Sequence, residues 1–160
     1  MAGQPIAVGL GRTPALAQKA IALGYAAYAP IAVEKPQEFK HAEACAGRRG
    51  AVAIDPTRIL NYDSDKELCR LLGKRSGTAF VLPLSHVLID SDHRAQSMRR
   101  FKRFCGNCAL CGARVVLYND SGDALMLKGP REMIAIMTAV LGMTGTAAKA
   151  SITEWSAEIA

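Results

Sequence analysis

Short apolar runs alternate with segments of helical spacing along this chain. The apolar runs, which are typical of buried strands, lie at 6–10, 26–33, 51–54, 78–84 and 114–118. Because both faces of a parallel sheet are covered, its strands are continuously apolar. We therefore interpret these runs as strands of a parallel sheet, with Pro30 interrupting the second of them.

The segments between the runs have the spacing of helices. Thr13 can cap a helix that has Pro14 at its first position, and Gly24 follows its end. In the segment 64–74 the leucines share one face, which predicts a strong amphipathic helix. The expected helices are 13–24, 36–49, 64–74, a basic helix from residue 94 onward, 130–141 and 144–155.

The alternation of strands and helices predicts an α/β fold with a parallel sheet. The 160 residues are most economically a single domain spanning 1–160, whereas a closed eightfold barrel takes about 200 residues or more. We therefore expect alternating βα units in a TIM-barrel-like but shortened or incomplete sheet. Its strands at 51–54, 78–84 and 113–118 should be adjacent in that order and parallel.

The composition is that of an ordinary globular protein, half apolar and 21% charged, with a net charge of +6. A positive balance suits nucleic acid or another acidic partner. No apolar run reaches the roughly 18 residues that cross a bilayer, and the N-terminus has no secretory pattern. We therefore expect no membrane association and a cytoplasmic location. The five cysteines are irregularly spaced, which favours reduced thiols over a disulfide framework.

Three cysteines, Cys105, Cys108 and Cys111, recur every three residues. Thiolates at this spacing can hold corners of an iron–sulfur cluster, and a zinc site could add Cys69 or His93 as fourth ligand. The fourth cysteine of ferredoxin-type runs is missing from the sequence. On a helix the three side chains form a narrow stripe suited to packing against a sheet. We favour packing and keep an iron–sulfur module as an alternative.

A second group of metal-type ligands, His86, Asp90, Asp92 and His93, follows a predicted strand. Active sites of parallel α/β proteins lie at this end of the strands. A metal-dependent phosphoesterase or hydrolase is therefore the other alternative. No His-x-His pair fixes a metal geometry, however, and Asp92 is well suited to cap the helix that follows. The sequence also has no dinucleotide, Walker or Gly-x-Ser-x-Gly motif.

The basic side chains are concentrated in the C-terminal half. Residues 94–103 hold five Arg or Lys and no carboxylate. A basic helix on an α/β framework favours binding of a polyanion, with a solvated helix face as the ordinary alternative. We expect one face that contacts RNA phosphates, formed by Arg99, Arg100, Lys102, Arg103, Lys128 and Arg131. The candidate RNA-binding residues are Arg94, Arg99, Arg100, Lys102, Arg103, Arg114, Lys128 and Arg131.

Several segments between residues 51 and 159 occur in a recognisable order. They are a strand with a turn, a strand, an Arg-rich helix, a Val-Val-Leu strand, a Ser-Gly turn, a Pro-containing turn and two closing helices. Their positions are 51–60, 79–88, 98–103, 114–117, 121–123, 127–132, 134–143 and 144–155. This order resembles ribonuclease P protein component 3, the TIM-barrel-type protein subunit of archaeal and eukaryotic ribonuclease P.

The resemblance implies an RNA-binding subunit of the ribonucleoprotein that removes the 5′ leader from precursor tRNA. In such a particle the RNA carries out the chemistry with magnesium ions, while protein subunits support RNA folding and substrate binding. The implied partners are ribonuclease P RNA, precursor tRNA and a ferredoxin-like protein subunit. The holoenzyme is then a tRNA-processing endoribonuclease. The isolated subunit is implied to have no cofactor and no catalytic residue of its own.

Overall fold

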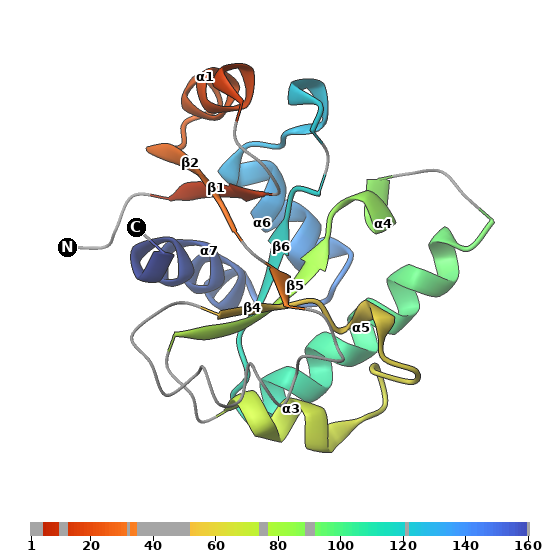
Figure 1. Ribbon diagram of the computed structural model, residues 1–160. Coiled ribbons are helices and arrows are strands. Elements are labelled where there is room, and N and C mark those ends of the chain that lie inside the picture. The colour runs from red at the N-terminus through yellow and green to blue at the C-terminus, as the bar shows by residue number, and fades with distance from the viewer. Residues whose placement is uncertain are drawn as a thin grey trace.

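The computed structural model describes residues 5–9, 13–31, 33–34, 52–73, 77–88, 92–120 and 122–159. It shows parallel strands with helices packed around them (Figure 1). The predicted helix at 36–49 lies outside the described residues, as do Asp90 and Ser121. No described helix is both long and apolar enough to cross a bilayer.

The strands form two parallel sheets. Their bounds are β1 Ile6–Gly9, β2 Ala27–Pro30, β3 Val33–Glu34, β4 Val52–Ile54, β5 Thr78–Pro83 and β6 Val115–Tyr118. The first sheet pairs β1 with β2, and the second has the order β3-β4-β5-β6. In the second sheet Ile54 faces Phe80, and Phe80 faces Val115. The predicted adjacency and parallel direction of β4, β5 and β6 are confirmed.

The two sheets are neighbours in space. The run 26–33, predicted as one strand, is divided into β2 and β3 just after Pro30, which has no N–H to continue a ladder. The first sheet also meets the end of β6. The Asn119 N–H, just after β6, donates to the Val8 carbonyl of β1 at 3.1 Å, and an isolated parallel bridge joins Asn119 to Gly9. The described strands do not merge into a closed barrel. The expectation of an incomplete TIM-like fold is confirmed.

Apart from the single turn of α4 (Ser85–Leu88), which was not expected, the described α-helices agree with the predicted segments to within a few residues. They are α1 Pro14–Ala22, α3 Lys66–Gly73, α4 Ser85–Leu88, α5 Arg94–Cys111, α6 Pro130–Ala139 and α7 Gly145–Ile159, with short 3-10 helices η2 Pro56–Arg58 and η3 Ala124–Met126. As predicted, the Thr13 hydroxyl oxygen caps α1 by accepting from the Leu16 N–H at 3.3 Å. Gly112, at φ 72°, ends α5 in the left-handed conformation that glycine adopts without strain.

The core lies on both faces of the second sheet. On one face Phe80 of β5 packs edge-on against Phe104 of α5, with ring centroids 5.0 Å apart. On the other face Trp155 of α7, which is 1% exposed, packs with Val81 and Val116. Because both faces are covered, β4, β5 and β6 are apolar along nearly their whole length. The sheet therefore holds α5 on one side and α7 on the other (Figure 1).

Candidate functional site

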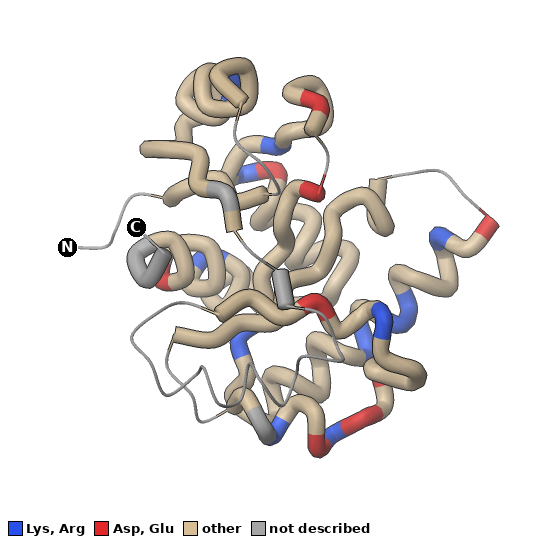
Figure 2. The backbone as a smooth tube through the Cα atoms, viewed as in Figure 1, with Lys and Arg blue, Asp and Glu red and all other residues tan. Residues whose placement is uncertain are grey.

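The helix α5 presents a basic outer face. Phe101, Phe104, Cys105 and Cys108 point into the core, while exposed residues occupy the opposite side. This alternation follows the spacing of three and four residues that places side chains on one face of a helix. The exposed basic residues of that side, here called the α5 outer face, are Arg99, Lys102 and Arg103. Figure 2 shows Lys and Arg positions along the first half of α5, with acidic positions gathered before and on α3.

A buried carboxylate anchors two of the α5 arginines. The Arg100 Nε–H donates to Asp63 Oδ1 at 3.0 Å, and Arg103 Nη1 donates to Asp63 Oδ2 at 3.1 Å. The Asp63 side chain is only 7% exposed, so pairing of both oxygens offsets the cost of removing a charge from water. Asn107 adds a third bond from α5, donating its Nδ2 to the Asp63 carbonyl at 2.9 Å. The loop before α3 is thereby fixed to α5.

Tyr62 strengthens the same junction. The guanidinium carbon of Arg100 lies 4.6 Å from the centroid of the Tyr62 ring, in a cation–π arrangement. The ring itself meets Phe101 and Phe104 edge-on. Burial raises the pKa of the Tyr62 hydroxyl above its ordinary value, and Asp63 raises it further while Arg100 lowers it. Arg100 is therefore held on two sides, by an aromatic ring and by a carboxylate.

Three other candidate residues have different neighbours. Lys102 lies at the edge of a groove beside the α6–α7 turn. Its aliphatic chain lies close to Gly142, since a Cβ atom added to that glycine would be 3.1 Å from the Lys102 Cε atom. The guanidinium of Arg114, just before β6, pairs with Glu154 of α7 at 3.4 Å. Arg94 begins α5 and is half-buried. Of these three, Lys102 alone belongs to the α5 outer face.

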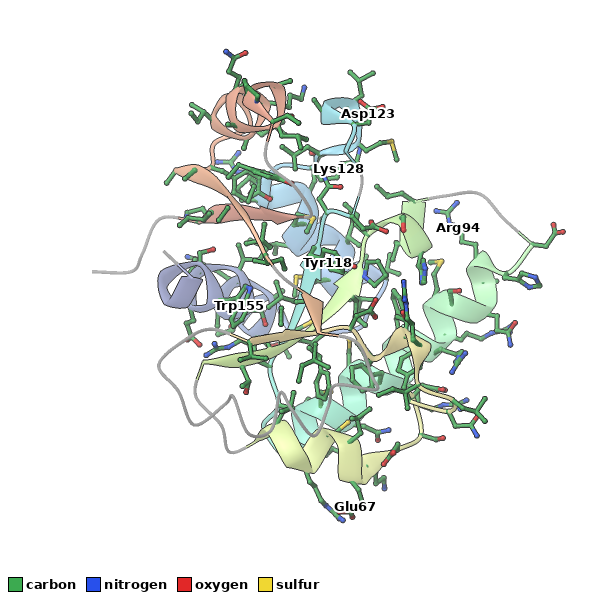
Figure 3. All side chains as sticks on the ribbon, viewed as in Figure 1. Glu67, Arg94, Tyr118, Asp123, Lys128 and Trp155 are labelled. Atoms are coloured by element: carbon green, nitrogen blue, oxygen red, sulfur yellow. The ribbon has the colours of Figure 1, made fainter. Side chains whose placement is uncertain are left out.

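Lys128 and Arg131 lie in a separate region, after β6. Lys128 lines a small cavity with Trp155, and Arg131 lies beside Gly24 at the end of α1. Figure 3 shows Lys128 apart from Arg94 and from α5. The six residues expected on one face are therefore divided between two regions. The reason is that α5 leads away from the carboxyl edge of the sheet by about 1.5 Å per residue, whereas Lys128 stays near that edge.

Polar groups at the carboxyl edge of the sheet are used as caps. Asp120, after β6, accepts from the backbone N–H of Ser85 at 3.0 Å and also from its hydroxyl. Asp55, after β4, accepts from the Thr57 N–H at 2.9 Å and from its hydroxyl at 2.7 Å. Burial raises the pKa of the nearby Tyr118 hydroxyl, and these two carboxylates raise it further. Each carboxylate thus accepts two hydrogen bonds from a residue in the first turn of a short helix and caps that helix.

The described residues of the alternative hydrolase site, His86, Asp92 and His93, are not grouped to hold a metal. His86 of α4 is exposed, and its ring stacks on Phe101 with centroids 5.9 Å apart. Asp92 and His93 are exposed before α5, and His93 takes the N-cap position that we expected for Asp92, without a side-chain cap bond. Within the described ranges, no three His, Cys, Asp or Glu side chains are grouped to hold a metal.

The three-cysteine run packs into the core, as favoured from the sequence. Cys105 and Cys108 are buried, Cys111 is half-buried, and the Sγ atom of Cys108 lies 3.5 Å from the Sγ atom of Cys69 on α3. Burial raises the pKa of the Cys105 thiol to about 12, and the contact with the Cys69 thiol, together with burial, raises the pKa of Cys108. Both thiols are therefore neutral at ordinary pH, and neutral thiols behave as small apolar side chains.

Sequence reasoning missed Asp63, Tyr62 and Asn107. The available signal lay in α5, where Arg100, Arg103 and Asn107 recur at intervals of three and four residues between the buried and the exposed face. A polar stripe of this kind indicates a neighbouring segment with a matching charge. The sequence does not identify that neighbour, because Asp63 is 37 residues from Arg100.

No family model and no curated protein matches the sequence. Among solved structures, the fold is similar to that of a chain in the cryo-EM structure of archaeal ribonuclease P with mature tRNA, with a TM-score of 0.62 and 14% sequence identity. The similarity covers 96% of this chain and 88% of the other. The protein therefore has the fold of a component of that assembly.

Proposed function

We propose that this protein is an RNA-binding subunit of ribonuclease P, the ribonucleoprotein that removes the 5′ leader from precursor tRNA. The observation that carries the proposal is the fold similarity to a chain of archaeal ribonuclease P over 96% of the sequence. The order of sequence segments from 51 to 159 supports the same family independently, because residue patterns do not depend on the three-dimensional fold. The proposed family is ribonuclease P protein component 3.

The charge distribution supports RNA as the partner. The helix α5 carries five Arg or Lys and no carboxylate, and the chain has a net charge of +6. Basic side chains that neutralise phosphates release counterions, and this release provides most of the sequence-independent affinity for nucleic acid. We propose the α5 outer face as the principal RNA contact. The further candidates are Arg94, Arg100 and Arg114, which lie on or after α5, and Lys128 and Arg131, which lie in the separate region after β6.

The proposed particle implies separate roles for the RNA and for this subunit. The RNA would carry out phosphodiester cleavage with magnesium ions, and this subunit would support RNA folding and hold precursor tRNA. A ferredoxin-like protein subunit is the proposed protein partner, in the cytoplasm. The engaged carboxylates of Asp55 and Asp120 fit this account, because both serve to fix the fold at the edge where a barrel enzyme would place its catalytic groups.

Co-purification tests the proposal. A tagged full-length chain is expressed in its native cells, and the RNA and proteins that remain bound at moderate salt are sequenced and identified by mass spectrometry. We expect one abundant structured RNA, precursor tRNA species and a small ferredoxin-like protein, all absent from a tag-only control. Recovery of the chain without RNA, but with stoichiometric zinc or manganese and phosphoesterase activity, would refute the proposal in favour of the hydrolase alternative.

A further inference from the structure

Asp63 is unusual among the acidic residues that the structure describes, because it is buried and pairs with two arginines at once. Its side chain is 7% exposed, whereas that of Glu67, which pairs with Arg70 on α3, is 76% exposed. A buried ion pair is a weak source of stability, since desolvation offsets most of the attraction. Burying this carboxylate therefore affects the orientation of the two arginines more than the stability of the fold.

The two arginines differ in what they leave free. The Arg100 Nε–H donates to Asp63, its guanidinium stacks on the Tyr62 ring, and its side chain is 34% exposed. Arg103 donates to Asp63 through Nη1 alone, and its side chain is 65% exposed. A guanidinium has five N–H donors in a planar fork, and a pair of parallel donors fits the oxygens of a phosphate. In Arg103 the Nε and Nη2 edge remains for such a contact.

The free edge of Arg103 belongs to the α5 outer face. Arg99 precedes it by four residues, so the two side chains are neighbours on one side of the helix. Lys102 is exposed beside them. Arg99 and Lys102 can contribute charge from flexible side chains, while Arg103 is fixed in direction by the carboxylate behind it.

We propose that Asp63 is a positioning residue that holds Arg103 as a preformed fork for a backbone phosphate of RNA. The proposal rests on the proposed function and assigns the ligand chemistry of one residue within the α5 outer face. A side chain that is already ordered loses less rotamer freedom on binding than a mobile one, which corresponds to about a 2- to 10-fold gain in affinity. Lysine cannot replace the fork, because its ammonium is a single point charge.

The sign of one substitution separates this role from a simple effect of charge. Asp63→Asn removes a negative charge beside the basic helix. If only net charge mattered, RNA would bind more tightly. If Asp63 positions Arg103, binding weakens by about 2- to 10-fold despite the added positive balance. The measurement is the dissociation constant of the full-length chain for a precursor-tRNA transcript, taken by fluorescence anisotropy at several salt concentrations.

Two control variants exclude indirect explanations. Glu67→Gln makes the same charge change and also leaves an arginine, Arg70, without its partner, but on α3. We expect its affinity to be unchanged or slightly higher. Asn107→Ala loosens the attachment of the loop to α5 without touching the carboxylate. If it weakens binding as much as Asp63→Asn does, loop attachment explains the effect and the positioning role is refuted. Circular dichroism at the assay temperature confirms that each variant is folded.

Substitutions at Arg103 complete the test. Arg103→Lys should weaken binding nearly as much as Arg103→Gln, since both remove the fork. In the Arg103→Gln background, Asp63→Asn should have no further weakening effect, because Asp63 acts through Arg103. Arg103→Gln weakening binding while Asp63→Asn leaves it unchanged or tighter would overturn the inference and leave the proposed function intact. A wild-type chain that does not bind the transcript would overturn both.

Discussion

Reversing the charge of the α5 outer face gives a quantitative prediction. The variant Arg99→Glu, Lys102→Glu, Arg103→Glu changes the net charge by two for each substitution, from +6 to 0. All three side chains are exposed, but Arg103 also pairs with the buried Asp63, so circular dichroism at the assay temperature is used to check that the variant is folded. If the three residues contact phosphates, the affinity for RNA should fall at every ionic strength.

The salt dependence gives the number of contacts. When a protein neutralises Z phosphates, the slope of log K against log salt is about −0.9Z on a duplex and −0.7Z on a single strand. Losing three contacts should therefore flatten the slope by roughly two to three units. The assay is a titration of the complex between the full-length chain and a precursor-tRNA transcript, over a range of potassium chloride concentrations.

A matched control separates location from total charge. Lys19, Lys66 and Lys149 lie on three other helices, α1, α3 and α7. Their reversal to Glu brings the net charge to the same value of 0. We expect this control to weaken binding less and to leave the slope close to that of the unsubstituted chain. Equal slopes for the two triple variants would refute the assignment of the α5 outer face.

Three further predictions concern the core and its thiols. Replacing Cys105, Cys108 and Cys111 together with Ala should leave the metal content unchanged and lower the free energy of unfolding by about 1–3 kcal/mol; iron or zinc that disappears in the variant would show instead that the run binds metal. Trp155→Ala should cost about 3–5 kcal/mol in urea unfolding, because a fully buried indole is lost from one face of the sheet, and a change below 1 kcal/mol would contradict that packing. The Cys105 thiol has its pKa raised from 9.0 to about 12 in the folded state, so its contribution to stability is complete below pH 9 and is lost as pH rises toward 12. Cys105→Ala should therefore reduce the alkaline loss of stability, as measured by thermal unfolding across that range.

The fold was largely predictable because local patterns and parallel topology agree. The apolar runs at 51–54, 78–84 and 114–118 need long crossovers between them, and those crossovers contain the predicted helices. Pro30 was recognised as an interruption, but its consequence, a division into two sheets, depends on which strands lie beside it. The single turn of α4 was not predicted, because it is held by Asp120, 35 residues away.

The site was predictable in part. The helix at 94–111 was identified from its charge and spacing, and the inward direction of Cys105 and Cys108 follows from the same periodicity. The pairing of Arg100 and Arg103 with Asp63 was not foreseen, because it joins a helix to a loop distant in sequence. Lys128 and Arg131 were grouped with α5 from their charge and from their position after the following strand, and neither gives information on the direction of their side chains.

The central claim is that this protein works within ribonuclease P. The most direct measurement is cleavage of a precursor tRNA by the particle purified through the tagged chain, before and after digestion with micrococcal nuclease. We predict release of the intact 5′ leader in magnesium buffer, and loss of that activity once the nuclease has removed the RNA component. A purified particle that leaves the leader in place, or one whose cleavage survives nuclease treatment, would contradict the account.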